Sequence, residues 1–347
     1  MLYAYDKIER HHTKEGHPEN AGRLAGTLDL LRADGILGRL EEIPVVRAER
    51  DLLERVHTPA YLDFVESVVA RGGGQLDPDT YACPVSFTAA CASAGALLSL
   101  LERVMTGTKR RGMSIMRPPG HHALSHQAMG FCIIANVALA ARVAREDYGA
   151  ERVLIVDWDV HHGNGTEAIL DEDPTIAFFS THQYPYYPGT GHLEHIGRGD
   201  GEGATVNVPF PAGVGDQGYR RAFEEILVPF AERFDPDLVI VSAGFDAHWR
   251  DPLAQERVSL PGFAELQRTV TGIADRHAEG RLLLALEGGY DLEVLPHAIL
   301  NALRLLEDRP LEDPAAEISD PFGLAPPSAE PDVTALITAA RRLHGLD

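Results

Sequence analysis

The sequence predicts an α/β fold with three layers, in which helices pack on a mostly parallel central sheet. From Gly112 onward, short apolar runs alternate with longer amphipathic segments, and such alternation favours parallel strands joined by right-handed crossovers. An apolar share of 44% in 347 residues is enough for a substantial core. Several apolar runs end in glycine beside titratable side chains, and open parallel sheets bind ligands at the carboxyl ends of their strands. We therefore expect an active site at that edge of the sheet.

The N-terminal part is predicted to be mainly helical. Residues 10–23 form a polar loop, after which leucines spaced over 24–31 fall on one helical face that Gly35 can end. Thr58 supplies an N-cap, followed by proline at the first position of a second helix. Residues 86–105 are rich in alanine and serine, which predicts a helix with a small-residue face for close packing.

Six strands are predicted in the remainder, at 113–116, 153–157, 176–180, 205–209, 238–242 and 282–286. Helices are expected at 136–148, 217–234, 261–278 and 293–307. No linker or repeat is visible, so we predict a single domain over 1–347 with its core at about 10–307, a Pro- and acid-rich segment at 308–331 and a last helix at 332–344. The connection 181–204 is long, and loops of that length are usually functional or disordered; its aromatics and prolines favour an ordered wall.

Composition limits the partners and the location. The formal net charge is −21, a field that repels nucleic acid and anionic lipid and attracts basic ligands such as polyamines or lysine-rich peptides. No apolar run reaches the roughly 18 residues of a membrane span, and the N-terminus lacks the pattern of a signal peptide. Three cysteines (Cys83, Cys91 and Cys132) without C-x-x-C spacing indicate a reduced, cytoplasmic setting.

The densest polar cluster follows the predicted strand 153–157. Asp157, Asp159 and His161 alternate, and side chains two residues apart in a strand share a face. Two carboxylates and an imidazole suit zinc or a similar divalent ion, and a catalytic zinc usually takes three protein ligands. The alternative is a strand end with solvated acids, although charges seldom concentrate in this way beside a buried strand.

Four other strands carry comparable groups at their carboxyl ends. These are Arg117-Pro118-Pro119-Gly120-His121-His122, Ser180-Thr181-His182, Ala243-Gly244-Phe245-Asp246 and Glu287-Gly288-Gly289-Tyr290. Because the carboxyl ends of parallel strands meet at one edge, the five endings are expected to converge on a single site.

This set of motifs resembles that of the zinc-dependent deacetylases, a superfamily that contains histone deacetylases, acetylpolyamine amidohydrolases and bacterial deacetylase-like amidohydrolases. His17-Pro18-Glu19 and Val56-His57-Thr58-Pro59-Ala60-Tyr61 also fit, so the resemblance covers about residues 10–305. The class II branch of the family is most similar in the motif Asp157-Trp158-Asp159-Val160-His161-His162-Gly163-Asn164-Gly165. The resemblance implies an arginase/deacetylase-like fold and a zinc-dependent amidohydrolase. Its substrate would be an acylated amine such as acetyl-lysine in a protein, an acetylated polyamine or a small metabolite.

The resemblance also implies roles at the metal. One catalytic zinc would be held by Asp159, His161 and Asp246, leaving a position for water and the substrate carbonyl. His122 would act as general base and then acid, with His121 as its electrostatic partner.

Three further residues would support this chemistry. Asp157 would orient His121, Asn164 would orient His122, and Tyr290 would donate its hydroxyl to the developing oxyanion. Class I members carry a carboxylate where this chain has Asn164, and a neutral amide should raise the basicity of His122 less than a carboxylate would.

The resemblance also implies roles for residues around the metal site and the substrate channel. A structural potassium site would use Asp157, Asp159, His161 and Ser180. Gly130, Phe131 and the loop 184–191 would wall an acyl-lysine tunnel, although they could instead be ordinary core residues. Asp79 would hold the substrate at the rim. Leu253 stands where a polyamine-selective branch carries glutamate, which favours other substrates.

Two different classes of protein stay open as alternatives. A non-catalytic acyl-amine binding protein could use the same fold, but it would have no need of a general base. An arginase-like di-metal hydrolase would need more bridging carboxylates than one D-x-H with a distant Asp246 supplies. Each of these classes is compatible with a homo-oligomer. His162 is more easily explained as a residue packed beside the metal site than as a fourth metal ligand.

Overall fold

Eight strands form one sheet in the computed structural model, which describes residues 1–307, 317–326 and 329–346. The strand order is β2-β1-β5-β10-β9-β6-β7-β8, and every neighbouring pair is parallel. The bounds are β1 Leu2–Ala4, β2 Glu41–Glu42, β5 Arg111–Ser114, β6 Val153–Asp157, β7 Ile176–Gln183, β8 Thr205–Phe210, β9 Leu238–Ala243 and β10 Leu282–Leu286. The predicted parallel α/β fold is thus confirmed.

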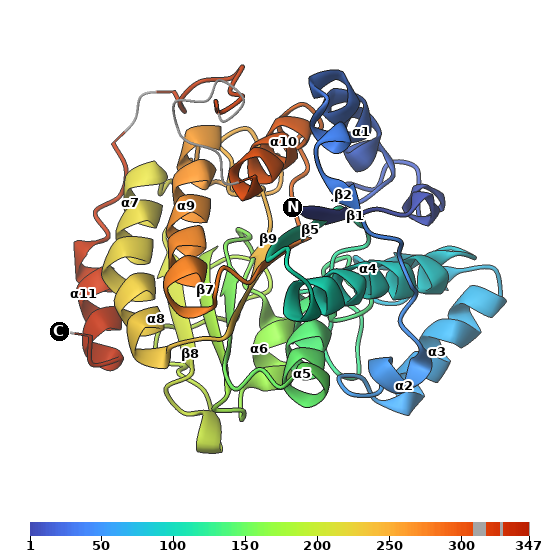
Figure 1. Ribbon diagram of the computed structural model, residues 1–347, viewed down its shortest axis with the longest axis horizontal. Coiled ribbons are helices and arrows are strands. Elements are labelled where there is room, and N and C mark those ends of the chain that lie inside the picture. Colours follow the sequence, from blue (N-terminus) through green and yellow to red (C-terminus); the bar gives the residue numbers. More distant parts are fainter. Residues whose placement is uncertain (308–316, 327–328, 347) are drawn as a thin grey trace.

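Helices cover both faces of this sheet (Figure 1). On one side lie α1 Gly22–Asp34, α7 Asp216–Ala222, α8 Val228–Phe234, α9 Leu260–His277, α10 Val294–Leu306 and α11 Thr334–Leu343. On the other lie α2 Arg50–Leu53, α3 Pro59–Ala70, α4 Ser86–Thr106, α5 Asn136–Tyr148 and α6 Asn164–Leu170.

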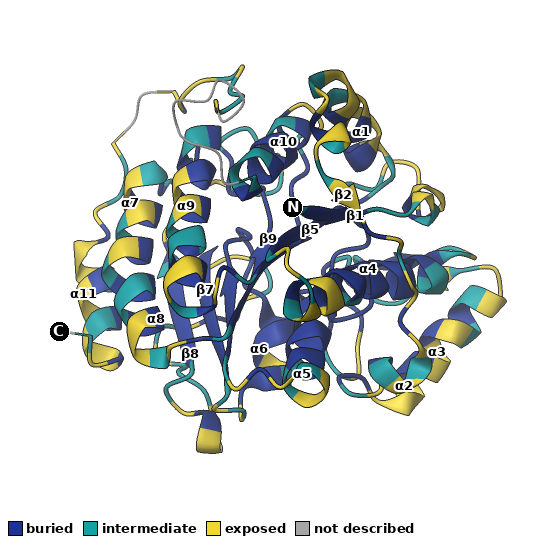
Figure 2. Ribbon diagram, viewed as in Figure 1, coloured by how far each residue is buried: buried dark blue, intermediate teal, exposed yellow. Residues whose placement is uncertain are grey.

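The sheet separates two hydrophobic cores because successive side chains of a strand point to opposite faces. Along β6, Leu154 and Val156 belong to the core shared with α1 and α7 to α11. Val153 and Ile155 belong to the core shared with α3, α4 and α5. Figure 2 shows the central strands buried between the two layers of helices, whose outer faces are exposed. This burial explains why these strands read as nearly continuous apolar runs.

Most helix ends lie within two residues of the predicted positions. The expected caps are present: Tyr61 N donates to Thr58 Oγ1 at the start of α3, and Gly35 takes a left-handed conformation, φ 77°, after α1. One departure is the predicted helix 217–234, which is divided into α7 and α8 by a π-helical turn at Phe223–Leu227.

The differences concern short elements and the end of β7, which runs to Gln183 instead of residue 180, so that Ser180, Thr181 and His182 lie within the strand. Strands β1 and β2 were not predicted, and β5 begins two residues earlier than the apolar run that suggested it. Residues 76–80 connect β3 Gly74–Gln75 to β4 Tyr81–Ala82 in a small antiparallel hairpin that was not predicted. Of the segment 308–331, residues 308–316 and 327–328 lie outside the described residues.

By length and composition alone, helix α4 is long and apolar enough to span a membrane, although it holds no continuous apolar run of that length. However, 72% of its most apolar stretch is buried inside the protein, and core helices can have the same length and composition. Its small face holds Gly95, where an added Cβ would lie 2.0 Å from Val46 O, as close packing requires.

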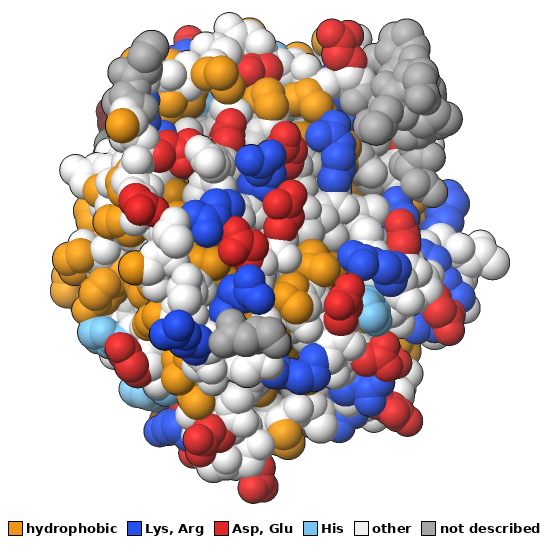
Figure 3. Space-filling model, turned by 90° about the vertical axis from the view of Figure 1, so that its left-hand side faces the viewer, with side chains coloured by type: hydrophobic (Ala, Val, Ile, Leu, Met, Phe, Trp, Pro, Cys, Tyr) orange, Lys and Arg blue, Asp and Glu red, His pale blue; other side chains and the backbone are white. Residues whose placement is uncertain are grey.

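The outer surface of α7, α8 and α11 carries acidic and basic side chains close together (Figure 3). Arg221 of α7 pairs with Glu225 of the π-helical turn, and Glu232 of α8 pairs with Arg276 of α9. On this face acidic and basic side chains therefore neutralise one another in ion pairs.

Candidate active site

A cavity of about 250 Å³ opens where the central strands end. Its lining comes from loops that follow β5, β6, β7, β9 and β10 and from the hairpin of β3 and β4. The lining residues are Asp79, His122, Gly130, Phe131, His161, Tyr186, Tyr187, Leu253 and Tyr290.

Three potential metal ligands meet beside this cavity. Nδ1 of His161 lies 3.2 Å from Oδ1 of Asp159 and 3.2 Å from Oδ2 of Asp246, and the ligand atoms all lie within 4.8 Å of one another. Ligands held about 2.0 to 2.1 Å from a tetrahedral zinc stand roughly 3.3 Å apart. The donor set and its spacing therefore fit a zinc ion.

Asp157 does not join this group, contrary to the expectation from strand alternation. Strand β6 ends at Asp157, so the two-residue repeat of side-chain direction does not extend to Asp159 and His161. The Asp157 carboxylate instead contacts His121, with Oδ2 3.0 Å from Nδ1. Its backbone lies opposite Ser180 in the ladder of β6 and β7.

Glycines at the strand ends make room for the carboxylates. A Cβ added at Gly244 would lie 2.1 Å from Oδ2 of Asp159, and one at Gly288 would lie 2.0 Å from Oδ2 of Asp246. Backbone amides hold the same groups: Gly288 N donates to Asp159 Oδ2 at 2.7 Å, and Val160 N donates to Asp246 Oδ1 at 2.9 Å. Side chains at these glycine positions would collide with the ligands.

The electrostatics of the group follow from burial and mutual charge. Burial alone would raise the pKa of Asp159, but the neighbouring His121 and His161 hold it well below its usual range. Burial together with the charge of Asp159 raises the pKa of Asp246 to about 6. Two carboxylates this close favour a cation between them, and a metal ion supplies one.

Two adjacent histidines follow β5 and have different environments. Their rings are 4.0 Å apart. Burial would lower the pKa of His121, but the carboxylates of Asp159 and Asp157 outweigh it and raise the value to about 10. Burial, and then the charges of His121 and His161, lower the pKa of His122 well below its usual value. The pair thus combines a charged imidazole with a neutral one.

Each of the two imidazoles has its own orienting partner. His121 uses Asp157, as described above, and Nδ1 of His122 lies 2.7 Å from Oδ1 of Asn164. Gly130 closes over His122 with φ +55°, and a Cβ there would lie 2.2 Å from His122 Cδ2. Of the two, only His122 lines the cavity among the described residues.

Tyr290 presents its side chain to the cavity from the loop after β10. Burial raises the pKa of its phenol well above the usual value, so the hydroxyl keeps its proton. The guanidinium of Arg23 lies 4.7 Å from the ring centroid, and the backbone N of Tyr290 donates to Oδ2 of Asp251 at 2.7 Å.

Aromatic rings form the walls of the cavity. Phe131 stands edge-on to Tyr290, with ring centroids 5.7 Å apart. Tyr187 stands edge-on to His122 at 5.2 Å, and Tyr186 lies over His161 at 5.9 Å. The predicted loop 184–191 therefore does contribute a wall.

The remaining predicted residues lie at the mouth or behind the walls. Asp79 lines the cavity, but its Oδ1 also accepts from Gly130 N at 3.0 Å. Leu253 lines the cavity and is partly exposed, which places it toward the opening. His162 has both ring nitrogens engaged, with Thr190 at 2.8 Å and Glu167 at 3.1 Å, which leaves none for a metal. Ser180 Oγ pairs with His182 Nδ1 at 2.9 Å.

Sequence reasoning did not single out four residues that the geometry places at the site: Arg23, Tyr186, Tyr187 and Asp251. Arg23 lay in a stretch interpreted only as a polar loop, and the tyrosines lay in a loop taken as a whole. Asp251 could have been found from the sequence, because it is an acidic residue only two positions before Leu253.

Among the described residues, a second group with metal-binding side chains is His121, Cys132 and Glu287. Burial raises the pKa of the Cys132 thiol well above its usual value, which disfavours the thiolate that a metal needs.

Comparison with known proteins identifies similar chains. A family profile described as the histone deacetylase domain matches residues 17–306. The chain is 38% identical to "Histone deacetylase 10, chloroplastic" of Oryza sativa subsp. japonica, across 96% of this chain and 79% of that protein. It is 40% identical to "Histone deacetylase-like amidohydrolase" of Pseudomonas aeruginosa, across 80% of this chain and 73% of that protein.

Two further matches are a human protein and a solved structure. "Polyamine deacetylase HDAC10" of Homo sapiens is 38% identical, across 88% of this chain but 46% of that longer protein. The crystal structure of the HDA15 HD domain superposes with a TM-score of 0.88 at 33% identity, covering 99% of this chain and 96% of that one.

Proposed function

Since the chain belongs to the histone deacetylase family, we propose that its active site holds one zinc ion on Asp159, His161 and Asp246. The chain is an amidohydrolase of the deacetylase type. The observation that carries the zinc proposal is the 3.2 Å spacing of His161 Nδ1 from both carboxylates. A zinc ion there supplies Lewis acidity, which polarises an acyl carbonyl and makes water nucleophilic near neutral pH.

His122 is the general base in this proposal. Its Nδ1 faces the amide oxygen of Asn164, so Nδ1 carries the hydrogen and Nε2 has the free lone pair. That lone pair takes the proton of the attacking water and later returns it to the leaving amine. The burial of His122 favours the neutral state that a base needs.

His121 and Tyr290 stabilise charge. The imidazolium of His121, balanced by Asp157, lies beside His122 and opposes its premature protonation. Tyr290 keeps its phenolic proton and donates it as a hydrogen bond to the oxyanion that forms on the acyl carbon. Asp157 and Asn164 act through the imidazoles that they orient.

We propose an acetyl or other short acyl group on a flexible aliphatic amine, such as acetyl-lysine, as the substrate. The aromatic walls from Phe131, Tyr186 and Tyr187 suit an aliphatic stem, and Asp79 at the mouth suits the polar group beyond it. An acetylated polyamine is the second candidate, supported by the similarity to a human polyamine deacetylase. The apolar Leu253 at the mouth argues against a second ammonium group there.

Further proposals concern the surroundings of the site. A structural potassium ion would use oxygens near Asp157, Asp159, His161 and Ser180. The pairing of Asp157 with Ser180 in the ladder of β6 and β7 supports this proposal. A cytoplasmic location is supported by the free thiols of Cys83, Cys91 and Cys132. The net charge of −21 supports a basic ligand over nucleic acid or an anionic membrane. A homo-oligomer stays a proposal without a specific interface.

A substrate screen tests this function. The purified protein would be given acetyl-lysine peptides, acetylpolyamines and small acetylated amines, each with and without a chelator. We expect release of acetate from an acetyl-lysine peptide, loss of that activity with chelator, and recovery on addition of zinc. Turnover that survives exhaustive chelation, with metal content measured at zero, would refute the metal proposal, whereas binding of acetylated amines without any turnover would favour the binding-protein alternative.

A further inference from the structure

We propose that Glu287 is the positioning residue that sets the location of the His121–His122 loop relative to Tyr290. The inference rests on the proposed function, because that function gives these three side chains their chemistry. Glu287 itself does not line the cavity, so its role would be exerted through the groups that it holds.

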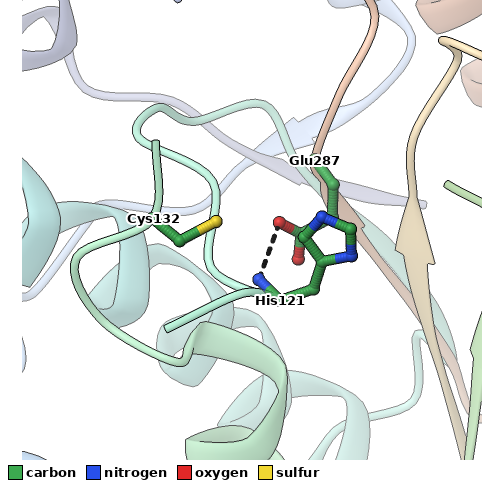
Figure 4. A group of neighbouring side chains, drawn as sticks. All are labelled: His121, Cys132 and Glu287. Atoms are coloured by element: carbon green, nitrogen blue, oxygen red, sulfur yellow. Dashed lines mark hydrogen bonds between the residues drawn. The ribbon is translucent and has the colours of Figure 1, made fainter. Parts of the chain in front are cut away.

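The contacts of the Glu287 carboxylate join two loops. The side chain is fully buried and follows the last residue of β10. Its Oε2 accepts from Gly120 N at 2.6 Å and from His121 N at 3.2 Å, and its Oε1 accepts from Ser242 Oγ at 3.4 Å. Figure 4 shows the carboxylate lying against His121, with the Cys132 side chain pointing toward it.

The backbone of Glu287 is held as well. Its N donates to Ala243 O at 3.2 Å in the neighbouring strand, and its O accepts from Nη2 of Arg23 at 2.6 Å. The residue is therefore a fixed point at the end of β10, only three positions before Tyr290.

The Glu287 carboxylate connects two chain segments beyond the point where the backbone pairing of β5 and β10 ends. Strands β5 and β10 are neighbours, and their ladder ends at the pair Ser114 and Ala285. Beyond that pair, the loop with the two histidines leaves β5 while the loop with Tyr290 leaves β10. The hydrogen bonds that the amides of Gly120 and His121 donate to Glu287 connect these loops directly.

The loop is also confined from its other side. A Cβ added at Gly120 would lie 2.6 Å from Ile134 O and 2.7 Å from Asn136 N. Gly120 is thus held between Glu287 and the start of α5, so the length of the side chain at position 287 determines where the loop can sit. A displacement of about 1 Å at reacting groups can lower a rate by about 100-fold.

A buried carboxylate is costly unless donors satisfy it. Burial raises the pKa of Glu287 to about 7, although His121 and the Gly120 amide lower it. Because two backbone amides point at one oxygen, an acceptor at this reach is what the loop needs. Glutamine offers that acceptor without the charge, whereas aspartate offers the charge without the reach.

The test compares Glu287→Gln with Glu287→Asp on an acetyl-lysine peptide. We expect Glu287→Gln to keep kcat within about fivefold of the parent. Glu287→Asp should lower kcat at least tenfold, with KM within threefold and zinc content unchanged, since it moves the histidines and leaves the metal ligands in place. The matched control is Glu256→Asp at another buried carboxylate, outside the cavity lining, where kcat should stay within twofold.

A second readout needs no turnover. Hydrogen exchange at the Gly120 and His121 amides should be at least tenfold faster in Glu287→Asp than in the parent, and close to the parent in Glu287→Gln. The reverse order of the two variants in kcat or in exchange, or equal behaviour of both, would overturn the proposal. If the parent itself failed to release acetate, the proposed function would be refuted. The exchange data would still show whether Glu287 holds the Gly120 and His121 amides.

Discussion

Asn164 faces the imidazole of His122 with its amide oxygen, at 2.7 Å from Nδ1. The amide nitrogen of Asn164 points the other way and donates to Sδ of Met129 at 3.3 Å. The amide is therefore an acceptor for the Nδ1 hydrogen, and Nε2 of His122 is left as the base on the cavity side. A neutral partner in this position leaves the charge state of His122 to burial and to its charged neighbours.

Asn164→Asp should make His122 harder to deprotonate. A carboxylate near an imidazole raises its pKa, commonly by 1 unit or more. Since the base must be neutral, the acidic limb of the kcat/KM profile should move to higher pH by about 1 unit. A profile measured at saturating zinc checks this, and a limb that stays in place or moves to lower pH contradicts the assignment of His122 as the base.

Tyr290→Phe removes the hydroxyl alone and keeps the ring that packs on Phe131 and Arg23. We expect kcat to fall about 100- to 1,000-fold, as when one donor to an oxyanion is lost. KM and zinc content should stay near the parent values, because the ring and the ligands are untouched. Full turnover by this variant on a substrate of the parent would show that the oxyanion is stabilised elsewhere.

Leu253→Glu should change the choice of substrate. A carboxylate at the mouth of the cavity attracts a substrate with a second ammonium group, so the ratio of kcat/KM for an acetylpolyamine to that for an acetyl-lysine peptide should rise by about tenfold. Leu253→Gln has nearly the same shape without the charge and serves as the control. An equal rise in both variants would assign the effect to polarity or size instead of charge.

Glu256→Gln should raise stability in a pH-dependent manner. Glu256 is buried, with 2% exposure, and burial raises its pKa from 4.5 to about 8. In the unfolded chain the group ionises near pH 4.5, so the folded state loses stability as pH rises from there to about 8. Melting temperatures should therefore be similar at pH 4 and several degrees higher for the variant at pH 8. The exposed Glu224→Gln should show no such trend, and a constant difference at all pH values would contradict the ionisation account.

The sequence carried enough information for the layered parallel fold because its central strands are buried on both faces. Apolar runs such as 153–157 are nearly continuous, and they are separated by helices with clear periodicity. Strands β1 and β2 have only three and two residues, too few for a periodic signal, and they exist because they pair at the edge beside β5.

The site was accessible to sequence reasoning where chemistry gathers at strand ends. Asp246 and Tyr290 lie within four residues of the ends of β9 and β10, so their convergence on β6 could be expected from parallel topology. The position of Asp157 could not be derived from alternation, because the strand ends there and the next turn changes the direction of the side chains. Arg23 and Asp251 act through contacts made across long sequence separations, which a local pattern does not contain.

Removal of a metal ligand tests the central claim most directly. Zinc would be measured by atomic spectroscopy in the parent and in Asp246→Ala, beside release of acetate from an acetyl-lysine peptide, with the exposed Asp29→Ala as the control. We predict one zinc per chain and turnover in the parent and in Asp29→Ala, and neither in a folded Asp246→Ala. A full equivalent of zinc with undiminished turnover in Asp246→Ala would contradict the account.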